Sequence, residues 1–189
     1  MVFVIGVFCE VIMYCGKNKT ACSSQAMIAQ TLLALMQQKA YDQISVSELC
    51  RDAGISRQTF YSLFSSKENV VTFLLRKQYY EEPTLPDRSS DCFHQLCLEY
   101  CRYIVNHSPF IRILVDNHID YLLYSSIYDS LAGCTAFFQD IDPPRRGFTA
   151  HFLAGGFTSI AKSYIQENCS LNIQQLYDIC VTLFEGKIL

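Results

Sequence analysis

The stretch that most constrains the fold of this chain is residues 44–69, which run ISVSELCRDAGISRQTFYSLFSSKEN. Ser45 and Glu48 have the spacing of a capping box, and this predicts where a short helix begins. Gly54 follows that helix at a point where a positive backbone φ is needed, and Ser56 is a favourable N-cap for a second helix. The sequence therefore predicts two short helices joined by a tight corner.

The side chains of these two helices divide into an inward and an outward set. Cys50 provides the small side chain that is needed where the helices cross, and Phe60 turns inward from the second helix. The motif as a whole covers residues 45–64. The outward set on the second helix comprises Arg57, Gln58, Thr59, Tyr61 and Ser62.

An outward set of this composition suits a helix that enters the major groove of DNA. Arginine can pair bidentately with guanine and glutamine with adenine. Hydroxyls and lysines near helix starts, or on a basic arm, are better placed for phosphate. Taken singly, each residue could equally belong to an ordinary polar helix face. The residues expected to contact bases are Arg57, Gln58 and Ser62, and those expected to contact phosphates are Ser47, Thr59, Tyr61, Lys67, Lys17 and Lys19.

The formal charge of −3 would by itself argue against a DNA-binding protein, but the charge is uneven. Residues 17–82 hold eight basic and six acidic side chains, whereas residues 83–189 hold seven and eleven. A mildly basic N-terminal part joined to an acidic C-terminal part is compatible with phosphate contact at one end of the molecule.

Helical periodicity dominates the rest of the chain, so the expected fold is all-α. A first helix is expected over residues 24–39. Residues 81–87 contain two prolines and interrupt the periodicity, which predicts a boundary between a DNA-binding domain at 17–82 and a C-terminal helical bundle at 83–189. Apolar spacing predicts helices in that bundle near residues 93–104, 110–114, 122–131, 143–164 and 173–184.

Residues 1–16 form an apolar extension that is too short for a membrane span of about 20 residues and lacks the features of a signal peptide. We expect either that the start codon has been placed too early or that these residues pack on the rest of the protein. The alternative is that they anchor the protein to a membrane or to a partner. The ten cysteines are scattered among helical periodicities, so we expect them to be reduced core residues of a cytoplasmic protein that does not bind membranes.

Residues 24–77 resemble the N-terminal domain of the TetR family of bacterial transcription regulators. The resemblance rests on ISVSELCRDAGISRQTFY from Ile44, on Phe64 and on Ser66-Lys67-Glu68. It implies a three-helix DNA-binding domain on an all-α regulatory domain that dimerises, and phosphate contacts at Thr59, Tyr61 and Lys67. Cys50 departs from the family's usual alanine. A looser resemblance to the family's penultimate helix covers FTAHFLAGGF from Phe148, and the apolar extension has no counterpart.

A twofold dimer would place two recognition helices on the halves of a palindromic site. Small residues at 150, 154–156 and 159 would let another helix approach closely, either across a dimer interface or within one subunit. Residues expected at the dimer interface are Ala154, Gly155, Tyr164, Leu176 and Leu183.

The C-terminal helical bundle also contains aromatic and histidine side chains that could line a ligand pocket or serve as ordinary core and surface residues. The expected function is a homodimeric repressor released from its operator by an unidentified small molecule. The alternative is a DNA-bound regulator whose body docks a protein. The pocket candidates are Tyr100, Tyr103, His107, Phe110, His118 and Tyr121.

No cofactor, metal or enzymatic activity is expected. His94, Cys97 and Cys101 share one helix face, but no second ligand cluster accompanies them, which favours a buried face over a metal site. Phosphate-binding glycine loops, nucleophile elbows and HExxH pairs do not occur in the sequence.

Overall fold

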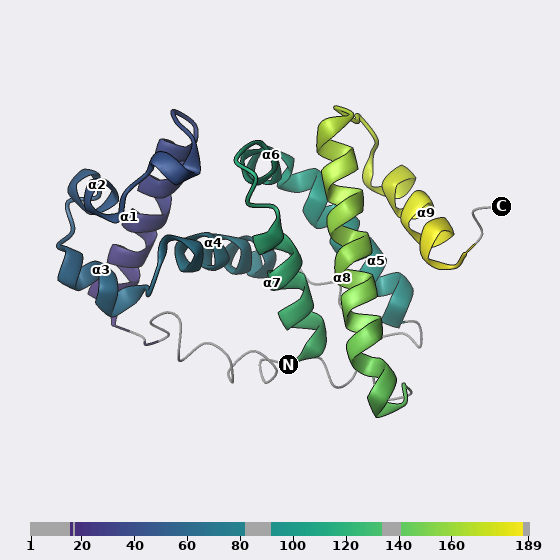
Figure 1. The fold of residues 1–189 in the computed structure, drawn as a ribbon. Coiled ribbons are helices and arrows are strands. Elements are labelled where there is room, and N and C mark those ends of the chain that lie inside the picture. The colour runs from purple at the N-terminus through teal and green to yellow at the C-terminus, as the bar shows by residue number, and fades with distance from the viewer. Residues whose placement is uncertain (1–15, 17, 82–91, 134–140, 187–189) are drawn as a thin grey trace. The chain divides into compact units, whose positions relative to one another are not determined.

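The computed structural model describes residues 16, 18–81, 92–133 and 141–186, and the elements they form are helices (Figure 1). They fall into two compact units that divide between Lys77 and Gln78. The expected boundary after residue 82 and residues 1–15 of the apolar extension lie outside the described residues. No described helix has the length and apolar character needed to cross a bilayer.

The first unit is built around α1 (Lys19–Met36), which packs against α2 (Val46–Asp52) and α3 (Arg57–Leu63) (Figure 1). A single 3-10 turn, η1 (Tyr41–Gln43), connects α1 to α2, and α4 (Lys67–Glu81) follows α3. The inward residues expected from periodicity form the core. Its fully buried side chains include Ile28, Leu32, Leu49, Phe60 and Phe64.

Helix α1 begins earlier and ends earlier than its apolar periodicity predicts. The Asn18 side chain accepts a hydrogen bond from the Thr20 amide at 2.9 Å and so caps the helix before Lys19. The first turn holds no large apolar side chain, which is why hydrophobic spacing did not reveal it. Lys19 therefore lies in the first turn of α1, not on an arm ahead of it, and Lys17 lies outside the described residues.

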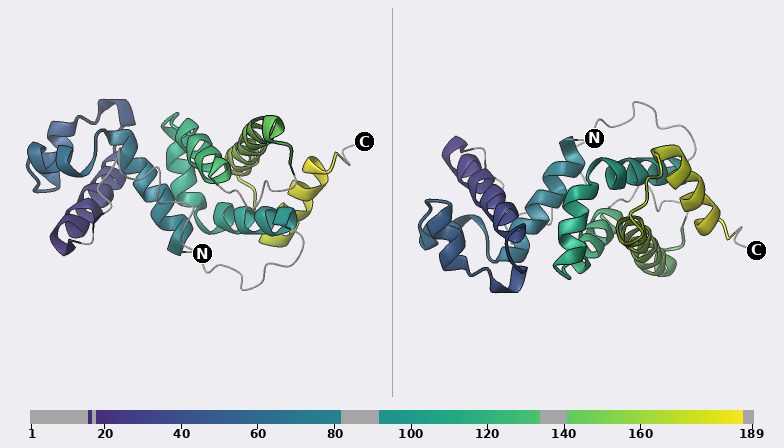
Figure 2. Two further views of the ribbon diagram at one scale, coloured as in Figure 1. Left: turned by 90° about the horizontal axis from the view of Figure 1, so that it is seen from below. Right: turned by 90° about the horizontal axis from the view of Figure 1, so that it is seen from above.

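The second unit contains α5 (Cys92–Asn106), α6 (Ser108–Asp116), α7 (Tyr121–Ala132), α8 (Pro143–Gln166) and α9 (Ile173–Phe184). Prolines occupy the first positions of α8, where a missing amide hydrogen costs nothing. Gly186 adopts a φ of +71° just after α9. Helices α6 and α7 pack against α8, and α9 packs against α5 (Figure 2).

Phe157 of α8 lies at the centre of the second unit and is fully buried. Its ring centroid is 4.4 Å from that of Tyr100 on α5 and 4.9 Å from that of Phe184 on α9. One aromatic side chain thereby joins three helices, so the relative positions of α5, α8 and α9 depend on a shared core.

Candidate DNA-binding interface

The corner between α2 and α3 is a Schellman motif. The Gly54 amide donates to the Arg51 carbonyl at 3.1 Å, and the Ile55 amide donates to the Cys50 carbonyl at 2.9 Å. Gly54 has a φ of +65°. A Cβ there would meet no atom within 4 Å, so the backbone conformation, and not lack of space, favours glycine.

Helix α3 is held by its cap and by its buried face. Ser56 Oγ accepts a hydrogen bond from the Thr59 amide at 3.0 Å, as expected of an N-cap. Phe60 and Leu63 are buried on the same helix. Arg57, Gln58 and Tyr61 are exposed, with Tyr61 at 58%. The helix therefore presents a long cation, an amide and a phenol to solvent on its first turns.

The hydroxyls of Thr59 and Ser62 already take part in hydrogen bonds within the helix. Thr59 Oγ1 lies 2.8 Å from Ser56 Oγ, and Ser62 Oγ donates to the Thr59 carbonyl at 2.8 Å. In this arrangement Ser62 offers only an acceptor to a partner, which suits an amino group of adenine or cytosine.

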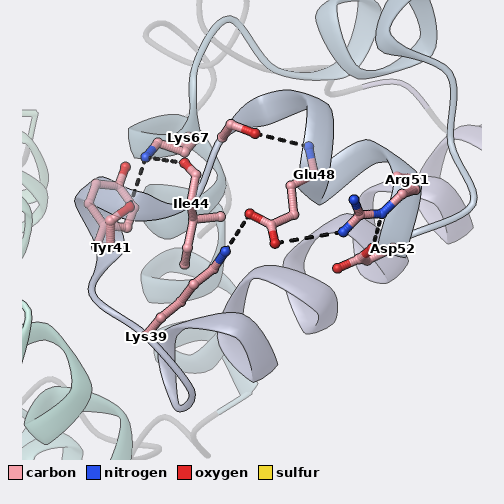
Figure 3. A network of polar contacts seen from close by, with 8 residues as sticks. Lys39, Tyr41, Ile44, Glu48, Arg51, Asp52 and Lys67 are labelled. Carbon is pink, nitrogen blue, oxygen red and sulfur yellow. Dashed lines mark hydrogen bonds and ion pairs between the residues drawn. The ribbon is translucent and has the colours of Figure 1, made fainter.

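Helix α2 begins with half of the expected capping box. Ser45 Oγ accepts from the Glu48 amide at 3.1 Å, but the Glu48 carboxylate is paired with the ammonium of Lys39 and lies 3.7 Å from the Arg51 guanidinium (Figure 3). Arg51 also pairs with Asp52 at 2.7 Å. Sequence reasoning missed Lys39, since nothing in the local pattern links two residues nine positions apart.

Two further residues of the motif lie where the sequence predicts them. Cys50 is buried at the helix crossing, and Ser47 is exposed on the first turn of α2. Burial raises the pKa of the Cys50 thiol, and the nearby Arg57 guanidinium lowers it in part. The thiol therefore stays protonated and serves as a small apolar residue beneath the start of α3.

Lys67 makes internal contacts that its sequence position did not predict. Its ammonium donates to the carbonyls of Tyr41 at 2.9 Å and of Ile44 at 2.7 Å (Figure 3). It also lies 4.1 Å from the centroid of the Tyr41 ring. The charge expected to face a phosphate thus lies against the turn between α1 and α2.

The pocket candidates divide into two groups. Tyr100, Tyr103 and Phe110 are buried, and the Tyr103 ring lies 4.8 Å from that of His107. His118 and Tyr121 are exposed, and His118 has a φ of +56° at the end of α6. The structure brings the rings of Tyr100, Tyr103 and His107 together and leaves His118 and Tyr121 at the surface.

The dimer candidates also divide. Ala154 and Leu176 are buried within the second unit, and the Tyr164 hydroxyl donates to the Leu171 carbonyl at 3.1 Å. Gly155 and Leu183 remain accessible, Gly155 partly so. Large exposed apolar side chains that the sequence analysis did not select are Phe148 at 80%, Phe152 at 65%, and Ile179 on α9.

The histidine and cysteines on α5 contact α9. His94 lies 3.5 Å from the Glu185 carboxylate. A hydrogen bond with Cys101, together with burial, raises the pKa of Cys180 to about 12, although a hydrogen bond with Cys97 lowers it. Among the described residues, no group of three or more potential ligands has an arrangement that could hold a metal ion.

Comparison with known proteins agrees with the helix-turn-helix geometry. Residues 28–72 match the model for bacterial regulatory proteins of the tetR family. The chain is 27% identical over 183 residues to the HTH-type dhaKLM operon transcriptional activator DhaS of Lactococcus lactis subsp. lactis, covering 90% of this chain and 93% of that protein. A stretch of 51 residues is 45% identical to the HTH-type transcriptional regulator EthR of Mycolicibacterium smegmatis, covering 27% of this chain and 24% of EthR.

Solved structures extend the similarity over most of the chain. The dihydroxyacetone kinase operon activator DhaS superimposes with a TM-score of 0.52 at 25% identity, covering 87% of this chain and 96% of that one. Lin0861 from Listeria innocua gives a TM-score of 0.74 at 14% identity, covering 94% and 97%, and at that identity the match supports the fold alone.

Proposed function

The chain belongs to the TetR family of bacterial DNA-binding transcription regulators, and from that premise we propose that it acts as a homodimer on a palindromic operator. The observation that carries this proposal is the division of α3 into a buried face with Phe60 and an exposed face with Arg57, Gln58 and Tyr61. A short helix with a hydrogen-bonding face at its start fits the major groove.

Each exposed residue of α3 has a role that follows from its chemistry. Arg57 would pair with guanine and Gln58 with adenine, and Ser62 would accept from a base amino group. The Tyr61 hydroxyl and the exposed Ser47 are suited to phosphate oxygens, as are Thr59 and Lys19. The phosphate contacts would set the register of the helix, and the base contacts would select the sequence.

Dimerisation would place two copies of α3 about one DNA turn apart. We assign the interface to the exposed apolar residues of α8 and α9, since burying large exposed apolar side chains favours association. We assign Gly155, which is partly exposed on α8, to the same interface, whereas the burial of Ala154 and Leu176 supports packing inside one subunit. The face is formed by Phe148, Phe152, Ile179 and Leu183.

We propose repression as the regulatory outcome, because an operator-bound dimer can exclude polymerase from an overlapping promoter. Activation is the second candidate, favoured by the similarity to DhaS, whose name describes a transcriptional activator. In either case the protein would act in the cytoplasm, where its DNA is found. A reporter gene behind the selected operator, with and without the protein, distinguishes the two outcomes.

Control of DNA binding is assigned to the second unit. A small-molecule effector would act by binding a non-DNA-binding conformation more tightly than the DNA-binding one. The packing of Tyr100 on Phe157 and of Tyr103 on His107 favours the alternative, in which the body docks a protein. Native mass spectrometry of the protein isolated from its own cells would separate a bound small molecule from a bound polypeptide.

The main test is selection of bound duplexes from a random pool, followed by gel-shift comparison of wild type and Arg57→Ala. Wild type should select a palindrome. Arg57→Ala should lose about 1–3 kcal/mol on that site and relax the preference at one position in each half. If wild type selects no sequence, operator binding is refuted. If Arg57→Ala keeps the same preference, Arg57 does not read a base.

A further inference from the structure

Arg51 is an exposed arginine on the last turn of α2. Its side chain is 70% exposed. It follows Ser47, which is also exposed, by four residues, and residues four apart lie on the same face of a helix. Helix α2 therefore carries a cation one turn beyond the serine that we assign to a phosphate.

The backbone of Arg51 belongs to the corner that leads into α3. Its carbonyl accepts a hydrogen bond from the Gly54 amide at 3.1 Å, and this is one of the two hydrogen bonds of the Schellman motif. Helix α2 also packs against α3. The backbone that carries the Arg51 side chain is therefore fixed relative to the helix that presents Arg57.

Two carboxylates orient the Arg51 guanidinium (Figure 3). Its Nε–H donates to Asp52 at 2.7 Å, and one terminal nitrogen lies 3.7 Å from Glu48. Consecutive side chains on a helix point about 100° apart, so the bond to Asp52 turns the guanidinium to one side of α2. The Glu48 carboxylate is itself paired with Lys39. The network joins two cations to two anions, so as a whole it does not repel DNA.

This arrangement leaves most of the guanidinium available to a ligand. Arginine presents five N–H groups in a planar fork, one on Nε and the others on the two terminal nitrogens. Among the described residues, the hydrogen bond to Asp52 is the one that this side chain makes, and it uses the Nε–H. The N–H groups of the terminal nitrogens remain, and a pair of them matches two oxygens of a phosphate.

We propose that Arg51 binds a DNA phosphate from the last turn of α2, and that Asp52 is a positioning residue that holds the guanidinium for this contact. This inference rests on the proposed operator binding. It adds to that function a phosphate contact one turn beyond Ser47.

The salt dependence of DNA affinity tests the phosphate contact. The probe is a duplex carrying the sequence that wild type selects from a random pool. Arg51→Gln should reduce the slope of log affinity against log salt by about 0.9 for each bound subunit, because fewer counterions are released. It should weaken binding evenly across sequences and leave the base preference unchanged. An unchanged slope overturns the contact, and an altered base preference overturns phosphate as its target.

Two further variants separate a local contact from net charge. Arg145→Gln makes the same change in charge at an exposed arginine on the first turn of α8, and it should leave the slope unchanged. Arg51→Lys keeps the charge and should restore most of the slope that Arg51→Gln loses. Equal losses of slope in Arg145→Gln and Arg51→Gln would show an effect of net charge alone and overturn the contact.

The positioning role of Asp52 predicts effects of opposite sign in two backgrounds. Asp52→Ala removes a negative charge, which by charge alone should strengthen DNA binding. Because Asp52 orients Arg51, Asp52→Ala should instead weaken binding when Arg51 is present. It should strengthen binding in the Arg51→Gln background, where no guanidinium is left to orient. An effect that does not change sign between the two backgrounds overturns the positioning role.

Thermal unfolding separates these effects from loss of structure. Arg51, Asp52 and Arg145 are exposed, so each variant should keep a Tm close to that of wild type. A fall in Tm large enough to account for the lost affinity would make the network structural and overturn the proposal. If wild type selects no DNA, the proposed function fails and this inference fails with it. If wild type selects a palindrome and Arg51→Gln keeps the wild-type slope, the inference alone fails.

Discussion

Gly156 and Phe184 lie so close together that a Cβ on Gly156 would be 2.6 Å from a carbon of the Phe184 ring. That ring also packs against Phe157, at 4.9 Å between centroids, and against Phe93, at 6.0 Å. A Cβ on the neighbouring Gly155 would meet no atom within 4 Å. The absence of a side chain at Gly156 therefore lets Phe184 of α9 pack closely on α8, whereas there is room for a side chain at Gly155.

Gly156→Ala should destabilise the protein. Overpacking costs about 1–3 kcal/mol, and the better helix propensity of alanine returns only about 0.5–1 kcal/mol. Gly155→Ala is the matched control and should be neutral or stabilising, since it gains the propensity without the clash. Urea denaturation of both variants measures the difference, and equal midpoints would show that Phe184 does not constrain Gly156.

Alanine substitutions at Ser45 and Ser47 should have different effects, the first on the free energy of unfolding and the second on DNA affinity. Ser45→Ala removes the cap of α2 and should lower the free energy of unfolding by about 1 kcal/mol. Ser47→Ala changes an exposed side chain and should alter stability by less than about 0.5 kcal/mol. Ser47→Ala should nevertheless weaken binding to the selected duplex. A loss of stability in Ser47→Ala with unchanged DNA affinity would reverse these assignments.

Stability should fall as the pH rises above about 9, in part because of Cys180. The hydrogen bond with Cys101 and burial raise its pKa in the folded state from 9.0 to about 12. The unfolded chain therefore releases this proton first, and unfolding becomes easier as pH increases through that range, by at most about 1.4 kcal/mol per pH unit. Cys180→Ala should show a shallower decline than wild type in chemical denaturation. Parallel declines would exclude Cys180 as a cause.

Phe148→Glu should weaken the proposed dimer without unfolding the subunit, because its side chain is 80% exposed on α8. We expect the dimer dissociation constant to rise at least about tenfold, or about 1.4 kcal/mol. Met27→Glu, which changes an exposed apolar residue of α1, should leave the dimer intact. Sedimentation equilibrium measures both. A dimer that survives Phe148→Glu would place the interface elsewhere.

The fold was largely predictable from the sequence, because helix periods and end signals agree locally. Pro143 and Gly186 mark the ends of α8 and α9 where they were expected. The start of α1 escaped prediction because an asparagine cap and a first turn without large apolar side chains carry no hydrophobic period.

Contacts that depend on tertiary structure were less predictable. Lys67 is 23 residues from the carbonyl of Ile44 that it binds, and the Glu48 carboxylate turns to Lys39 instead of closing the capping box. Of the exposed apolar residues of α8 and α9, the sequence analysis selected Leu183 but not Phe148, Phe152 or Ile179, because sequence spacing does not show which side of a helix its own subunit covers.

The arrangement of α3 has a consequence for how such proteins diverge. The helix is secured by Ser56 and by Phe60, neither of which is among the residues assigned to bases. Substitutions at 57, 58 and 62, which are exposed, can therefore alter which promoters the protein binds while the domain continues to fold. Duplicated copies of such a gene would be free to acquire new targets in a few mutational steps.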